Sequence, residues 1–147
     1  MKKIILLAML LMAFSVNAYA VDYVTVHQAM VSWPAALAAD GVTRIPENQI
    51  SYNVWLASKT ADPNHKTPIL IAGSRNGEGI KEKNFLVTIG SNAEGQYDVG
   101  VSAIRVASGV KINESEITWS NIKGTPDPWG LQYFILIGAP AGISTER

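Results

Sequence analysis

Apolar and polar residues alternate with a period of two along most of the chain after residue 20. Successive side chains of a β-strand point to opposite faces, so this alternation predicts strands with one buried and one exposed face. Gly, Pro, Asn and Asp separate the alternating segments, as is typical of turns between strands. The pattern predicts seven strands, over residues 23–27, 29–33, 51–57, 68–72, 84–89, 96–104 and 115–120.

The predicted strands indicate an all-β fold, because no segment reads as a helix long enough to connect parallel strands. The Ala-rich stretch over residues 34–40 is bracketed by Pro34 and Gly41 and is too short for a stable helix. Seven strands at this spacing are typical of an antiparallel β-sandwich. We therefore expect a seven-stranded antiparallel sandwich whose core holds the rings of Trp33, Tyr52 and Tyr97.

Three short motifs follow one another in a familiar order. Val31-Ser32-Trp33-Pro34 has a Trp at the end of the second predicted strand, and Tyr52-Asn53-Val54 opens the third. Tyr97-Asp98-Val99-Gly100-Val101 has a Tyr at the start of the sixth. Over residues 21–122 the chain resembles a fibronectin type III domain, which has an immunoglobulin-like fold. The resemblance implies a module that binds or separates other domains rather than an enzyme.

The first 20 residues have the layout of a secretory signal peptide. Lys2 and Lys3 precede an apolar run of residues 4–14, and Ala18-Tyr19-Ala20 has the small-residue pattern of a cleavage site. The apolar run is too short to cross a bilayer comfortably. We expect cleavage after Ala20, no membrane span afterwards, and a secreted or periplasmic protein. A retained N-terminal anchor helix is the alternative.

Charge and cysteine content narrow the function classes. Lys+Arg 12 and Asp+Glu 12 balance, and loss of the two leader lysines leaves a net charge of −2. Nucleic-acid binding needs a basic surface, so no nucleic-acid partner is expected. The chain has no Cys, which excludes disulfides, thiol nucleophiles and thiolate metal sites.

Residues 123–147 form a predicted linker and an apolar tail. Pro126 and Pro128 lie in the linker, and an uninterrupted strand-like run covers residues 129–137. This tail has three possible roles: it folds back on the sandwich, it pairs with another chain, or it begins a further domain. If it pairs with another chain, an oligomer is expected. The aromatic residues proposed to contact a partner are Trp129, Tyr133 and Phe134 in the tail, and Trp55 in the sandwich.

Trp55 is singled out because alternation places it on the face opposite Tyr52 and Val54. An exposed Trp there would be a platform for stacking a sugar or a side chain. The alternative is that the tail or a long loop covers it.

Candidate chemistry is sparse. His27 and His65 do not share a metal-ligand spacing, and each is expected to be an ordinary surface or edge histidine. Asp62-Pro63-Asn64-His65 contains oxygen ligands but lacks the dense carboxylates of a calcium loop. No catalytic, cofactor-binding or metal-ligating residue is therefore assigned.

The sequence leads to three functional hypotheses. The first is an exported, non-enzymatic module that binds another protein or a cell-surface component, or acts as a spacer. The second is a subunit of a surface assembly in which the C-terminal tail is an added strand. The third is a carbohydrate-binding accessory module or a small hydrolase.

Overall fold

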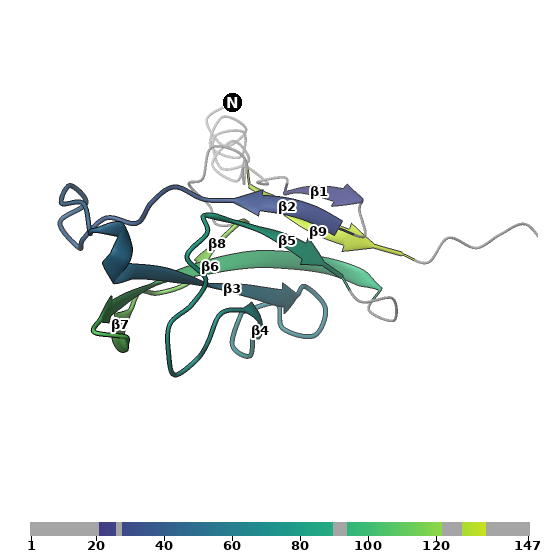
Figure 1. The fold of residues 1–147 in the computed structure, drawn as a ribbon. Helices are drawn as coiled ribbons and strands as arrows, with labels where there is room; N and C mark the ends of the chain where they lie inside the picture. Colours follow the sequence, from purple (N-terminus) through teal and green to yellow (C-terminus); the bar gives the residue numbers. More distant parts are fainter. Residues whose placement is uncertain (1–20, 26–27, 90–93, 122–127, 135–147) are drawn as a thin grey trace, which may run out of the picture.

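The computed structural model describes residues 21–25, 28–89, 94–121 and 128–134 (Figure 1). The only helical element among them is a single 3-10 turn, η1 (Glu47–Gln49), so the described chain is all-β. Its strands are β1 (Asp22–Thr25), β2 (Gln28–Ser32), β3 (Ile50–Ser58), β4 (Ile69–Ala72), β5 (Asn84–Thr88), β6 (Gly95–Ala107), β7 (Val110–Glu114), β8 (Thr118–Trp119) and β9 (Trp129–Tyr133).

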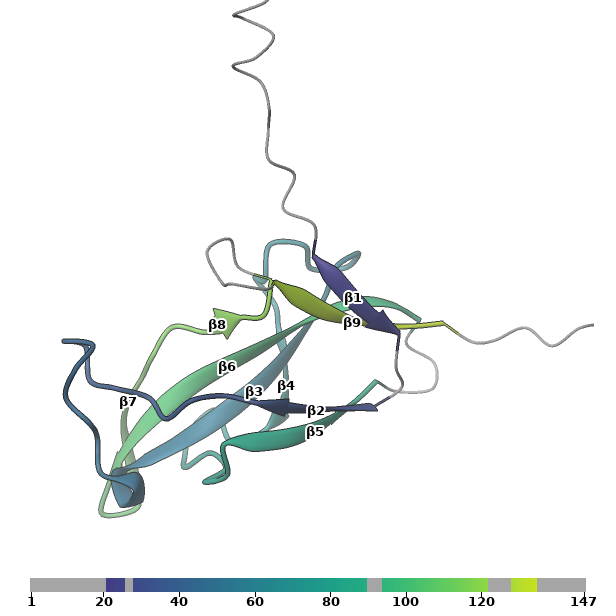
Figure 2. The same ribbon diagram turned by 90° about the horizontal axis from the view of Figure 1, so that it is seen from above.

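The described strands form two sheets. The larger has the order β1-β9-β6-β3-β4, with β7 and β8 also paired to β6. The smaller contains only β2 and β5, which form a separate layer over β3 and β6 (Figures 1 and 2). Neighbouring strands are antiparallel except β1 and β9, which are parallel.

The parallel pair makes the larger sheet mixed, which differs from the purely antiparallel arrangement that we expected. β1 pairs with β9 along four residues, from Asp22 opposite Trp129 to Thr25 opposite Gln132. This pairing covers the edge of an apolar strand that would otherwise be open to other chains. The placement of β1 also leaves β2 with β5 as its only partner in the described residues.

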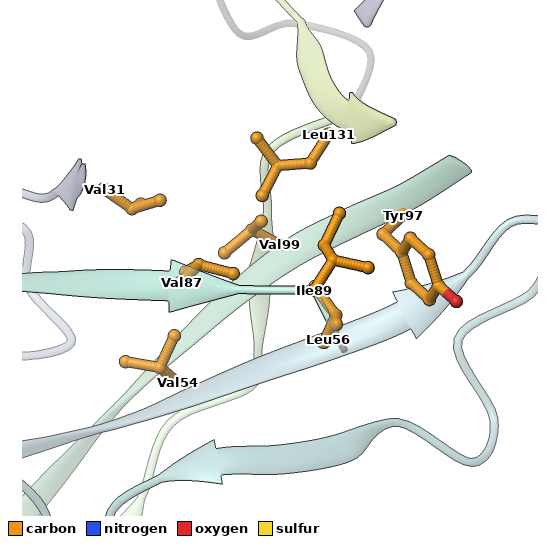
Figure 3. Packing of buried hydrophobic residues seen from close by; sticks show 8 residues of the cluster. All are labelled: Val31, Val54, Leu56, Val87, Ile89, Tyr97, Val99 and Leu131. Atoms are coloured by element: carbon orange, nitrogen blue, oxygen red, sulfur yellow. The ribbon is translucent and has the colours of Figure 1, made fainter. Parts of the chain in front are cut away.

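The core lies where the two sheets face each other. Tyr52, Val54 and Leu56 of β3 point inward, as the alternation predicted, and so do Tyr97 and Val99 of β6. β2 and β5 contribute Val31 and Val87 from the other layer. Figure 3 shows the eight residues that pack together: Val31, Val54, Leu56, Val87, Ile89, Tyr97, Val99 and Leu131.

Trp33 lies at the edge of this core rather than in its centre. Its ring is partly buried and meets Tyr52 edge to face, with ring centroids 5.6 Å apart. Tyr52 and Tyr97 are buried, as expected.

The connection after β6 is shorter than predicted, and it leads into a strand that was not predicted from the sequence. The predicted strands over residues 96–104 and 115–120 left residues 105–114 without a strand, but β6 continues to Ala107 and β7 covers Val110–Glu114. Ser108 and Gly109 make the connection with φ values of 51° and 76°. Two consecutive positive φ values are typical of the two-residue turns that suit β-hairpins. A Ser-Gly dipeptide is a turn signal, but it was not used in the prediction from the sequence.

The tail completes the larger sheet. β7, β8 and β9 follow one another along β6, with Ala107 opposite Val110, Gly100 opposite Trp119 and Tyr97 opposite Leu131. Residues 129–133 thus fold back within the chain, the first of the three roles considered for the tail. The predicted leader, His27, residues 123–127 of the linker and residues 135–147 lie outside the described residues.

No helix in the described part of the chain is long and apolar enough to cross a membrane.

Candidate functional site

An uncharged cleft opens between the end of β2 and the inner face of the larger sheet. Its volume is about 320 Å³, and it is bounded by residues 31–37, by β6, by residues 115–120 and by Trp129. None of the residues that line it carries a charge. We call it the Trp33 cleft.

The Trp33 cleft exists because the smaller sheet does not cover the whole of β6. Val99 is fully buried, whereas Val101 and Ala103, further along the same inner face, are only partly buried. No strand in the described residues pairs with the edge of β2 that faces away from β5. The inner face of β6 is therefore accessible from that side.

Aromatic rings and hydroxyl groups give the Trp33 cleft its chemistry. Trp33 and Trp129 both pack partly against the core, and Tyr52 lies between the layers. The Tyr52 hydroxyl accepts a hydrogen bond from the Ala36 amide at 3.2 Å. Ser115, Thr118 and Ser120 add hydroxyl-bearing residues along the opposite wall.

The indole N–H of Trp33 is the one buried side-chain polar atom without a hydrogen-bond partner among the described residues. Leaving such a donor unpaired costs about 1–3 kcal/mol. The N–H of a buried indole usually has a hydrogen-bond partner, but that of Trp33 has none in the described structure.

A second group of polar residues surrounds Asp98 on the outer face of β6. The Asp98 side chain is 0% exposed, and three side chains converge on its carboxylate. His65 Nε2 lies 2.8 Å from it, Asn121 Nδ2 donates at 2.6 Å, and the Tyr23 hydroxyl donates at 3.3 Å. Burial, followed by the charge and hydrogen bonding of Asp98, raises the pKa of Tyr23 to about 12. Tyr23 therefore stays protonated as a donor and is not activated as a nucleophile.

His65 differs from the surface histidine that we expected. Its side chain is 18% exposed, and its ring stacks on Trp119 with centroids 4.0 Å apart. Its backbone φ of 54° is unusual for a residue other than glycine. Asp98 follows His65 by 33 positions, so no local motif could have predicted the contact.

Asp62 holds the loop that carries His65. Its two carboxylate oxygens accept hydrogen bonds from the amides of Lys66 at 2.7 Å and Thr67 at 2.8 Å. Its oxygens are thus bound to the backbone, which gives Asp62 a structural role. No group of three acidic or histidine residues in the described chain could hold a metal ion.

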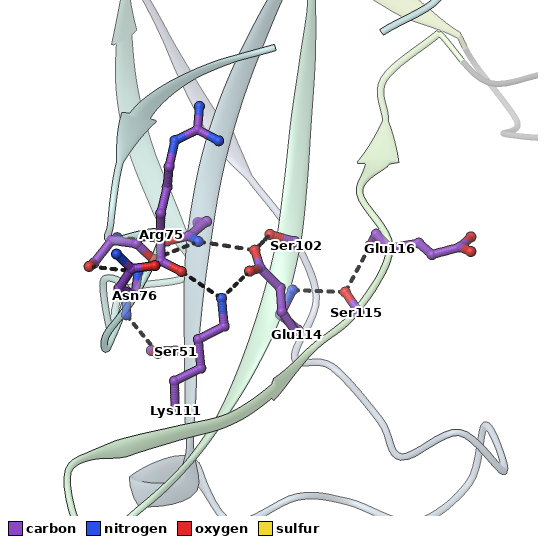
Figure 4. A network of polar contacts seen from close by, with 12 residues as sticks. Ser51, Arg75, Asn76, Ser102, Lys111, Glu114, Ser115 and Glu116 are labelled. Atoms are coloured by element: carbon purple, nitrogen blue, oxygen red, sulfur yellow. Dashed lines mark hydrogen bonds and ion pairs between the residues drawn. The ribbon is translucent and has the colours of Figure 1, made fainter. Parts of the chain in front are cut away.

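Glu114 is the centre of a third polar cluster (Figure 4). It accepts hydrogen bonds from Ser102 Oγ, from Asn53 Nδ2 at 3.0 Å and from Lys111 Nζ at 2.6 Å. Burial alone would raise the pKa of Glu114, but these hydrogen bonds and the charge of Lys111 lower it below its ordinary value. The same Ser102 hydroxyl accepts a hydrogen bond from Trp55 Nε1 at 2.9 Å.

Trp55 lies on the outer face, where alternation placed it, but it is only 6% exposed. It packs with Ala57 and Trp119, and the Arg75 guanidinium lies 4.9 Å from the centre of its ring. β8 and the loop after β4 therefore cover Trp55, and the ring is not the free stacking platform that we considered.

The tail residues proposed to contact a partner lie at different places. Trp129 lines the Trp33 cleft, whereas Tyr133 is partly buried at the far end of β9, opposite Gly95. Phe134 follows it and is 52% exposed. The sequence therefore pointed to one residue of the cleft, Trp129, but not to the cleft as a whole.

The cleft could not be predicted from local motifs, because its walls come from residues that are distant in the sequence.

Comparisons of the chain with protein-family models, with curated proteins and with solved structures find no match.

Proposed function

We propose that this protein is an exported, non-enzymatic module that binds an uncharged partner through the Trp33 cleft. In this proposal its fold is an immunoglobulin-like sandwich of the fibronectin type III kind. Binding another protein or a cell-surface component is the role that follows from an open, uncharged cleft. A spacer would not need such a cleft.

The arrangement of three aromatic residues supports the fold proposal. Trp33 follows β2, Tyr52 lies in β3 and Tyr97 lies near the start of β6, in the order of the motifs that resemble the family. All three contribute to the packing between the layers. β2 and β5 form one layer, and β3, β4 and β6 belong to the other.

The Trp33 cleft is the observation that carries the functional proposal. Ligand sites are concave and mostly apolar, with a few polar groups that orient the ligand. The cleft combines partly buried tryptophans with the unpaired N–H of Trp33. Because its lining is uncharged, it favours an uncharged partner; a charged group would lose its hydration there without gaining a counter-charge.

Site-specific photo-crosslinking in the cells that produce the protein tests this function. The photoreactive residue p-benzoylphenylalanine is incorporated at Ser32, in the cleft wall, or at Val110, which is 61% exposed beyond β6. We expect a discrete adduct from Ser32 and none from Val110. Equal labelling at both positions, or none at Ser32, would contradict the proposal. Mass spectrometry of the exported protein checks the expected N-terminus at Val21.

Carbohydrate binding is a second candidate, favoured by the unpaired N–H of Trp33 beside aromatic and hydroxyl-bearing residues. Sugar rings stack on tryptophan and accept hydrogen bonds through their hydroxyl oxygens. Titration with a neutral oligosaccharide such as cellohexaose, followed by tryptophan fluorescence, tests it. Saturable quenching that Trp33→Phe weakens would support this candidate, and an unchanged spectrum of the parent protein would argue against it.

A further inference from the structure

The edge of β2 that faces away from β5 is suited to accept another strand. The Trp33 amide donates to the Lys83 carbonyl at 3.0 Å on the β5 side. Backbone groups alternate in direction along an antiparallel strand, so those of Val31 face β5 while those of Met30 and Ser32 face away. No strand of the described chain pairs with this edge.

This open edge and the Trp33 cleft lie side by side. Val31 and Ser32 at the end of β2, and Trp33 directly after it, form part of the cleft wall. A strand added along β2 would bond to the backbone of Met30 and Ser32. Every second side chain of that strand would then point into the cleft, as in other cases of strand addition.

We propose that the apolar C-terminal tail of a second copy of this chain, residues 134–142, adds to β2 and fills the Trp33 cleft. This inference rests on the proposed function, because it names the partner that the cleft binds. It makes the protein a self-assembling subunit.

Charge and composition favour this occupant. Residues 134–142 read Phe-Ile-Leu-Ile-Gly-Ala-Pro-Ala-Gly and carry no charge, like the lining of the cleft. The first four are aromatic or aliphatic residues suited to a strand. An apolar segment of this kind left in water would favour aggregation, so a specific docking site would protect the protein.

The direction of β9 indicates that the cleft belongs to a second copy. β9 begins at Trp129, beside the cleft, and runs toward Tyr133 opposite Gly95, away from Val101 and Ala103. Residues 134–137 contain no Gly or Pro at which to reverse. If the strand continued in the direction of β9 at about 3.3 Å per residue, these residues would lead away from their own cleft and could reach only that of a neighbouring molecule.

A tail that enters the cleft of the next molecule makes a head-to-tail contact. The two surfaces involved are different, so each added copy leaves one free tail and one open cleft. We therefore expect open chains of subunits rather than a closed dimer.

Light scattering after size-exclusion chromatography tests the assembly on the mature chain, residues 21–147. We expect a mass that rises with concentration, and a monomer at every concentration for a variant that lacks residues 135–147. That variant keeps β9 intact, and circular dichroism checks that it is folded. A mature chain that stays monomeric at every concentration would overturn the inference. A tail that fills the cleft of its own molecule would give this same result.

Binding of a synthetic peptide with the sequence of residues 133–142 to the truncated variant tests the site. Ala103→Asp places a charge in the cleft, and Ala107→Asp places the same charge at an exposed position on the same strand. We expect Ala103→Asp to weaken peptide binding at least tenfold and Ala107→Asp to leave it unchanged. Thr118→Lys, at an exposed position in the cleft wall, provides a second cleft variant if Ala103→Asp does not fold.

The two proposals fail in different ways. If the peptide does not bind but Ser32 crosslinks to another molecule, the cleft binds a different partner and the self-assembly inference is overturned alone. If Ser32 gives no adduct and the peptide does not bind, both proposals are overturned.

Discussion

His65 Nε2 lies 2.8 Å from the carboxylate of Asp98, and this contact joins the loop between β3 and β4 to the outer face of β6. The contact is sheltered because Asp98 is completely buried. A buried carboxylate needs donors around it, and His65 provides one of the three side-chain donors in the described structure. The pair therefore stabilises the loop and sets the side-chain packing around β6.

Asp98→Asn should destabilise the protein by about 3 kcal/mol, the upper range for leaving buried polar groups mismatched. The new amide has one acceptor oxygen in place of two, so its NH2 group must face either the donors of His65 and Asn121 or the Tyr23 hydroxyl, and the charge that strengthens all three hydrogen bonds is lost. Urea denaturation of the variant and the parent measures the change. Glu116→Gln, at an exposed carboxylate, is the control and should leave the midpoint unchanged. Equal midpoints for the Asp98 variant and the parent would show that the cluster contributes nothing to stability.

Glu114 should make the protein less stable in acid. Its pKa in the folded state is below its ordinary value, so its contribution is fully present above about pH 4.3 and declines as the pH falls through the lowered pKa. Glu114→Gln should lower the free energy of unfolding by about 1–3 kcal/mol at pH 7 and flatten its decline below pH 5. Thermal unfolding between pH 7 and pH 2 measures both effects. Parallel curves for variant and parent would contradict the assignment.

Gly79→Ala should be far more damaging than Gly77→Ala. A Cβ at Gly79 would lie 2.1 Å from the Tyr52 carbonyl oxygen, which belongs to the backbone of β3 and cannot move freely. A Cβ at Gly77 would lie no closer than 3.4 Å to Ser74 Oγ. Such overpacking costs about 1–3 kcal/mol or more, so a drop in melting temperature is expected for Gly79→Ala alone. Similar melting temperatures for the two variants would show that β3 tolerates the added group.

Trp33→Phe should change the free energy of unfolding by less than about 1 kcal/mol. The substitution removes some buried apolar area but also removes the unpaired N–H, and these two effects oppose each other. Trp33→Ala, in contrast, removes the whole ring and should cost about 3 kcal/mol, the low end of the range for a buried tryptophan, because the ring is only partly buried. Chemical denaturation of the two variants separates the effects. A loss for Trp33→Phe as large as that for Trp33→Ala would mean that the N–H has a stabilising partner.

The period-two alternation was enough to predict which side chains face the core. Tyr52, Val54 and Leu56 are buried between the sheets as expected, because the alternation of a strand is a local property of its backbone. The same pattern placed Trp55 on the opposite face correctly. It could not show that Trp119 and Arg75 cover that face.

The sequence by itself determined an all-β chain with strands over β2, β3, β5 and most of β6, because apolar alternation and turn residues act over a few neighbouring positions. Only the tertiary structure decided that β1 runs parallel to β9 and that Asp98 meets Tyr23, 75 residues away, and His65, 33 residues away. It also decided that the inner face of β6 stays partly open and forms the Trp33 cleft. These contacts depend on how separate strands are ordered in space, and no local periodicity contains that information.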